Sequence, residues 1–215
     1  MKKSPQELVS AAGAASSSLE AHCSPELGRR VSPLISWAAF HLGATSAAEA
    51  IISGLASPAG WADLRRALNA DSYDVVEAQA FVIASSSVTT AVDLCSAALY
   101  RLAGGTPPVG REFDLGEWRR RGGRHRNHVP PALLRWLEEM LSSSDQSLLE
   151  NARHQSIHRT TARNIKLTVG TERLPATEFI VNGEAYPVDE LVPRLASHGE
   201  RSFDAFCEAI RAEFH

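Results

Sequence analysis

The feature that most constrains the fold is a long apolar stretch at residues 75–102. Its apolar side chains cover more than one face of a helix, so a helix formed here must be covered on several sides. The run Gly104-Gly105-Thr106-Pro107-Pro108 ends it. Glu77, Asp93, Arg101 and many hydroxyl groups argue against a membrane span. We therefore expect the central helix of a water-soluble bundle.

The composition favours a mainly α-helical body. Alanine and leucine are abundant, whereas strand-favouring runs are sparse before residue 164. Apolar residues make up 44% of the 215 and charged residues 22%, which is typical of a soluble globular protein. Glu7 and the run Ser16-Ser17-Ser18 interrupt the N-terminal region, so we expect no secretory signal. We expect a cytoplasmic protein without a membrane segment.

Local patterns predict the order of the elements. Capping residues, prolines and apolar periodicity predict helices at residues 4–21, 25–55, 61–68, 73–102, 132–141 and 146–164. The intervening residues 109–129 are expected to form a polar connector. Beyond residue 164 apolar residues alternate, Asn182-Gly183 signals a β-hairpin, and two short helices follow, one at 187–197 and one carrying Phe203 to Phe214.

These elements predict a mainly α fold in two parts. Residues 1–165 are expected to form the helical bundle. Residues 166–215 are expected to form a small C-terminal extension, a β-hairpin plus helix, that packs on the same domain.

The candidate for chemistry is the R-x4-H pairing of Arg153 and His158, on the predicted helix 146–164. Metal-independent RNA cleavage needs groups that move protons and a cation that stabilises the charged phosphorane. Histidine suits the first task and arginine the second. Residues five apart on a helix diverge by about 140° and rise about 7.5 Å, so the pair can line a cleft without touching. A second such pair, Arg120 and His125, is interrupted by two glycines.

The segment 148–159 around this pair resembles the terminal motif of HEPN domains, a superfamily of α-helical ribonucleases and nucleotide-binding proteins. In that family a polar residue commonly follows the arginine, and His154 matches this pattern. The apolar helix around residues 91–100 is similar to the central helix of these bundles, so the resemblance covers about residues 25–165.

The resemblance implies a function. It implies a bundle that dimerises across the motif helices and cleaves RNA without a metal or cofactor, leaving a 2′,3′-cyclic phosphate. Arg153 and His158 would be catalytic, with His154 as an adjacent site residue. Family members act as toxins, some with a nucleotidyltransferase-like antitoxin as partner, or in antiphage defence. Others keep the fold without catalysis, so a non-catalytic dimerisation or interaction module is the alternative.

A basic run precedes the motif and supplies candidate RNA-binding residues. The net charge of −3 means that any RNA contact must come from such a local patch. The alternative is that the run is an ordinary solvated surface. The candidates are Arg119, Arg120, Arg121, Arg124 and Arg126.

Three further predictions concern individual residues or small groups of them. His154 and His158 are four apart on the same face as Glu150, but Gln155 stands where a zinc-protease motif has glutamate, so no metal site is predicted. Asp93 would be costly to bury unpaired, and it either meets Arg153 or His158 or caps a break in its helix. The tryptophans at 118 and 136 are expected to be core or interface anchors.

Overall fold

The computed structural model describes residues 3–69, 73–107, 113–158, 163–165, 177–181 and 183–215, with the backbone alone for 73–74, 155–158, 163–165 and 177. This part of the chain is mainly helical. Its helices are α1 (Pro5–His22), α2 (Pro25–Leu55), α3 (Pro58–Leu68), α4 (Tyr73–Leu102), α5 (Leu115–Arg121), α6 (Gly123–Arg126), α7 (Pro131–Ser142), α8 (Ser144–His158) and α9 (Val188–Glu213). Its strands are β1 (Arg163–Ile165), β2 (Thr177–Val181) and β3 (Glu184–Pro187).

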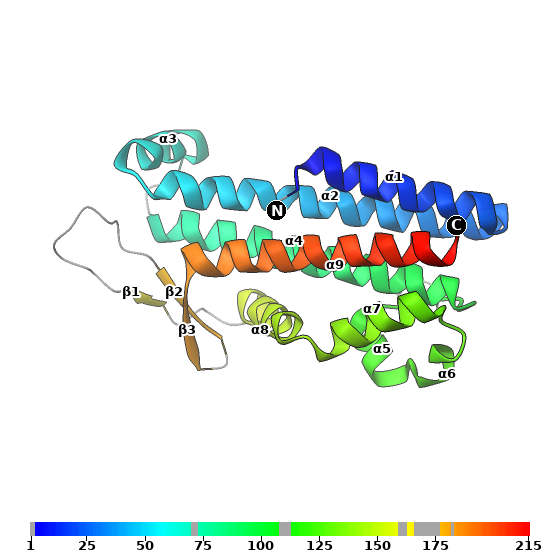
Figure 1. Ribbon diagram of the computed structural model, residues 1–215. Coiled ribbons are helices and arrows are strands. Elements are labelled where there is room, and N and C mark those ends of the chain that lie inside the picture. Colours follow the sequence, from blue (N-terminus) through cyan, green and yellow to red (C-terminus); the bar gives the residue numbers. More distant parts are fainter. Residues whose placement is uncertain (1–2, 70–72, 108–112, 159–162, 166–176, 182) are drawn as a thin grey trace.

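The long helices α1, α2, α4 and α9 lie side by side and form the body of the molecule (Figure 1). Helix α4 contacts α2, α9, α8 and α5, so the predicted central helix is confirmed. By length and composition Val75–Leu102 alone, among the described helices, is able to cross a membrane, yet 67% of its most apolar window is buried inside the fold. Its apolar character is therefore accounted for by packing within the bundle.

Local capping explains where several helices begin. The Ser4 hydroxyl accepts the backbone N–H of Glu7, and the Glu7 carboxylate accepts the backbone N–H of Ser4, which completes the capping box of α1. Ser24 caps α2 and Ser57 caps α3, each followed by proline at the first helical position. These starts satisfy the amide groups that helix ends leave without intrahelical partners.

Two buried tryptophans fasten the shorter helices to the long ones. The Trp118 indole N–H on α5 donates to the backbone carbonyl of Ser96 on α4 at 2.9 Å. The Trp136 indole N–H on α7 donates to the carbonyl of Ser202 on α9 at 2.8 Å. Both rings are buried with their polar atom satisfied, as expected of core anchors.

The small sheet is antiparallel with the order β1-β2-β3. The hairpin predicted at Asn182-Gly183 is confirmed, because β2 pairs with β3 and Val181 lies opposite Glu184. Gly183 has a φ of 85°, as a tight hairpin turn requires, whereas residue 182 lies outside the described part. Phe179 on β2 stacks on Phe81 of α4 with ring centroids 4.1 Å apart, which attaches the sheet to the bundle.

Three expected boundaries were wrong. The last described residue of α8 is His158, and residues 163–165 belong to strand β1, so the helix does not reach residue 164. The connector 109–129 contains the helices α5 and α6. The two short C-terminal helices are one continuous helix, α9. It continues through Gly199 because this residue is buried in the core, where tertiary packing outweighs the low helix propensity of glycine. The buried side chains of α9 belong to the same core as those of α1, α2 and α4.

Candidate functional site

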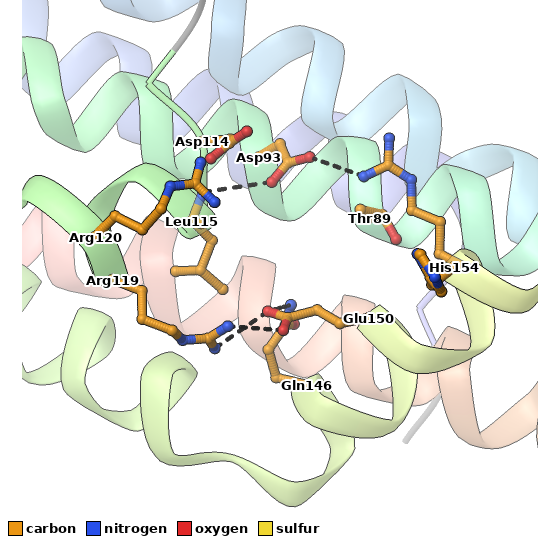
Figure 2. Close-up of a pocket in the computed structure, with 11 residues that line it drawn as sticks. Thr89, Asp93, Asp114, Leu115, Arg119, Arg120, Gln146, Glu150 and His154 are labelled. Atoms are coloured by element: carbon orange, nitrogen blue, oxygen red, sulfur yellow. Dashed lines mark hydrogen bonds and ion pairs between the residues drawn. The ribbon is translucent and has the colours of Figure 1, made fainter. Parts of the chain in front are cut away.

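A pocket of about 520 Å³ lies between α4, α5 and α8. Most of its lining side chains are charged or polar, and several of them point into the same space (Figure 2). The lining residues are Thr89, Asp93, Asp114, Leu115, Gly116, Arg119, Arg120, Gln146, Glu150, Arg153 and His154.

Helix α5 is placed against the pocket by its first and fourth residues. Asp114 caps the helix, and its carboxylate accepts the Glu117 backbone N–H at 2.7 Å. Leu115 and Trp118 are buried against the bundle, so the neighbouring Arg119 and Arg120 face outwards along the pocket rim. The predicted polar connector thus has an apolar side that fixes the direction of its arginines.

Helix α8 is held at its first turn by α9. The Asp145 carboxylate pairs with Arg194 at 2.7 Å and with Arg201 at 3.2 Å. On the buried side of the same turn, His198 Nε2 lies 3.1 Å from Gln146 Oε1. These contacts fix where α8 crosses the bundle and therefore where Arg153 and His154 lie.

A chain of hydrogen bonds leads from this buried histidine to the pocket. The Gln146 side-chain N–H donates to Glu150 Oε1 at 3.1 Å, so Gln146 Oε1 is left to accept from His198. Glu150 in turn accepts two N–H groups of Arg119, at 2.8 and 3.3 Å. The forked pairing holds the Arg119 guanidinium in one orientation beside the pocket.

Asp93 is the carboxylate that α4 contributes to the pocket. Its Oδ2 lies 3.7 Å from Arg153 Nη1, and its Oδ1 lies 3.5 Å from the backbone N–H nitrogen of Leu115 (Figure 2). Burial raises its pKa to about 6, and the nearby Asp114 and Glu150 carboxylates also raise it, whereas Arg153 and the Leu115 N–H lower it. The side chain is 31% exposed, so water and solutes reach it through the pocket.

The pocket contains some of the predicted site residues. Arg153 and His154 line it together with Arg119 and Arg120, from two separate helices. The side chain of His158 lies outside the described residues, although its backbone forms the end of α8. The pairing of Arg153 with Asp93 is one of the two alternatives considered for that aspartate.

The remaining basic candidates lie away from the pocket lining. Arg121 pairs with Glu117 at 3.5 Å, as Arg120 does at 2.8 Å. Arg124 and Arg126 belong to the short helix α6, where Arg124 is exposed and Arg126 half-buried. The predicted basic run is therefore divided into two arginines at the pocket and three outside it.

Comparisons with protein-family models, with curated proteins and with solved structures gave no match for this chain. Its function must therefore be argued from the chemistry of the pocket.

The charges that line this pocket balance each other. It holds three guanidinium groups and three carboxylates, in addition to His154. Protonation of Asp93, whose pKa is raised to about 6, would leave the pocket with a positive excess. Such a site can orient a phosphate through arginine and exchange protons near neutral pH. Among the described residues no group of three or more histidine, cysteine, aspartate or glutamate side chains is placed to hold a metal ion.

Five polar residues of this pocket were not among the predicted site residues, namely Thr89, Asp93, Asp114, Gln146 and Glu150. Gln146 and Glu150 lie one turn apart on α8, and Asp114 precedes α5. The spacing of Gln146 and Glu150 from Arg153 gives one signal, because these three residues follow at intervals of four and three along the predicted helix. Asp114 carries only the signal of a helix cap, which is common in any protein.

Proposed function

We propose that the chain is a metal-independent endoribonuclease of the HEPN type. The observation that supports it most is the position of Arg153 and His154 in a solvent-accessible pocket that Arg119 and Arg120 also line. In the proposed reaction the ribose 2′-oxygen attacks the adjacent phosphorus and the bond from phosphorus to the 5′-oxygen breaks. The products are a 2′,3′-cyclic phosphate and a free 5′-hydroxyl.

Each motif residue has a role in this proposal. Arg153 binds the phosphate and stabilises the negative charge that develops on it, since a guanidinium donates two parallel N–H groups. His158 transfers a proton, and His154 is an adjacent residue that contacts the RNA. Arg119 and Arg120 bind the flanking backbone phosphates.

The proposal includes a homodimer formed across α8. Ser147, Asn151 and His154 follow at intervals of four and three residues along one face of this helix, and position 158 continues that face. A two-fold axis beside it would bring two copies of the motif to one phosphate. A cytoplasmic location, a toxin or antiphage role and a nucleotidyltransferase-like antitoxin belong to the same proposal.

The test is cleavage of single-stranded RNA by the purified protein in EDTA. We expect wild type to produce ends with a 2′,3′-cyclic phosphate, and Arg153→Ala and His158→Ala to lower the rate by at least about 100-fold. Arg66→Ala on α3, an exposed position, and His22→Ala at the end of α1 are matched controls that should cut normally. Cleavage that requires a divalent metal, or full activity in both motif variants, would contradict the proposal.

A second candidate is the non-catalytic interaction module. It is favoured by the internal pairing of the pocket arginines, because Glu150 binds Arg119 and Glu117 binds Arg120. In that case the network would serve mainly to hold α5 against α8. It predicts no RNA cleavage by wild type, and changes at Arg153 that alter assembly without any effect on RNA.

A further inference from the structure

Asp93 is held less firmly than the other carboxylates of the pocket. Its contacts with Arg153 and with the Leu115 N–H measure 3.7 and 3.5 Å. By contrast, Glu150 binds Arg119 at 2.8 Å. Asp93 therefore carries the cost of partial burial without the short hydrogen bonds that usually offset it. Retaining a carboxylate in such a place is typical of functional groups.

The charged groups around Asp93 come from two sides. From α5 and its cap, Asp114, Arg119 and Arg120 face the pocket, and from α8 Glu150, Arg153 and His154 do so. Burial and the two neighbouring carboxylates oppose ionisation, and Arg153 favours it, which together bring the pKa to about 6. A group with this pKa exchanges protons readily near neutral pH.

The proposed cleavage needs two proton transfers, one from the 2′-hydroxyl and one to the 5′-oxygen. A single motif histidine performs one of them in each chain, and the dimer described above supplies a second histidine from the partner. Asp93 offers another solution, because it lies beside the arginine that would hold the phosphate. Both proton-transfer groups would then belong to one chain.

We propose that Asp93 is the general base of this site, and this rests on the proposed function. Its carboxylate accepts the proton of the 2′-hydroxyl while the 2′-oxygen forms its bond to phosphorus. The bond from phosphorus to the 5′-oxygen breaks, and protonated His158 donates its proton to that oxygen. One proton is taken and one is given, and no metal or redox partner is needed. Arg153 contacts both the base and the phosphate.

The test compares kcat/KM between pH 4.5 and 8.5 for wild type, Asp93→Asn and Asp93→Glu, with a labelled mixed-sequence single-stranded RNA in EDTA. Wild-type kcat/KM should rise tenfold per pH unit below about pH 6, because the base must be ionised, and should fall again at higher pH, where the proposed acid His158 loses its proton. Asp93→Asn should lose at least about 100-fold at pH 7, together with this acidic limb. Asp93→Glu should keep the limb with a smaller loss.

Asp63→Asn on α3 is the matched control, since it removes an exposed carboxylate far from the pocket and should leave the profile unchanged. Circular dichroism of each variant shows whether it is folded. A uniform decrease in Asp93→Asn at every pH, with the acidic limb intact, would identify a structural role and overturn the assignment. Wild-type activity in Asp93→Asn beside an inactive His158→Ala would overturn this inference alone. Failure of wild type to cleave RNA would overturn the proposed function and this inference together.

Discussion

The carboxylates of the pocket differ in whether their negative charge is balanced within the folded protein. The Glu150 carboxylate and the Arg119 guanidinium satisfy each other through a forked pair. The Asp93 carboxylate is partly buried with longer contacts, so its ionised form is less stable in the folded protein than in water. The group proposed for catalysis is therefore also one that weakens the fold, as is common for active-site residues.

Asp93→Asn should raise the unfolding free energy at pH 7 by about 1 to 2 kcal/mol, after a discount for the partial exposure of the side chain. The folded-state pKa of about 6 lies above the ordinary value of 3.8, so the folded protein binds this proton more tightly than the unfolded chain. The advantage of asparagine should be complete above pH 6 and should disappear as the pH falls to about 3.8. Urea denaturation at a series of pH values measures the difference in unfolding free energy between Asp93→Asn and wild type. A variant less stable than wild type at pH 7 would show that burial does not destabilise the Asp93 carboxylate.

Helices α9, α2 and α4 approach each other closely at Gly199. A Cβ atom at this position would lie 2.7 Å from Leu42 Cδ2 and 2.8 Å from Val88 Cγ1. A side chain therefore fits only if the helices or these two residues move. In the sequence Gly199 lies between the two short helices predicted at 187–197 and from Phe203 to Phe214, whereas in the structure it permits this close approach.

Gly199→Ala should destabilise the protein by about 1 to 3 kcal/mol, the usual cost of overpacking a core. Gly13→Ala on α1 is the control, because a Cβ there meets nothing within 4 Å and the residue is exposed within the helix. It should stabilise the protein by about 0.5 to 1 kcal/mol. Thermal unfolding of the two variants should thus move in opposite directions, and equal shifts would argue against the packing at Gly199.

Local signals in the sequence predicted the helices and strands better than they predicted the contacts between them. Ser4 and Glu7 predicted the start of α1, and the apolar stretch of α4 predicted a covered helix, because both depend on residues close in sequence. The continuity of α9 depends on burial against distant helices, which no local pattern contains. The same distinction between local patterns and long-range contacts applies to the candidate site. The motif on α8 was visible, whereas the pairing of Glu150 with Arg119 joins residues 31 positions apart.

At the scale of the whole molecule, the buried His198 couples stability to pH. Burial lowers its pKa below the ordinary value of 6.5. As the pH falls, this imidazole therefore gains a proton in the unfolded chain before it does so in the folded protein. Its contribution to stability is present above pH 6.5 and is lost as the pH falls through the lower folded-state pKa. Wild type should therefore lose stability in this range more steeply than His198→Gln. His22→Gln, at an exposed position, should leave the dependence of stability on pH as it is in wild type. Identical dependence in wild type, His198→Gln and His22→Gln would refute the coupling.

The proposed dimer predicts an effect of charge on the exposed face of α8. Ser147→Glu would place two negative charges near each other across a two-fold axis, so dimerisation should weaken by about tenfold or more. Ser17→Glu on α1 changes an exposed serine on another helix and should have no effect. Sedimentation equilibrium measures both. A wild-type protein that is monomeric at tens of micromolar would contradict assembly across α8.

The contact of α1 with α9 has a consequence for the order of folding. The backbone N–H of Lys3 donates to the Glu200 carboxylate across 197 positions of the sequence, and the Lys3 ammonium lies 2.7 Å from Asp204. Most helical bundles fold rapidly because their contacts are local, whereas such distant contacts form only after a long loop has closed. We expect α2 and α4 to associate early and α9 to dock late. Since Asp145 and Gln146 tie α8 to α9, the pocket should form in that final, slower step, and an intermediate without docked α9 would lack the proposed site.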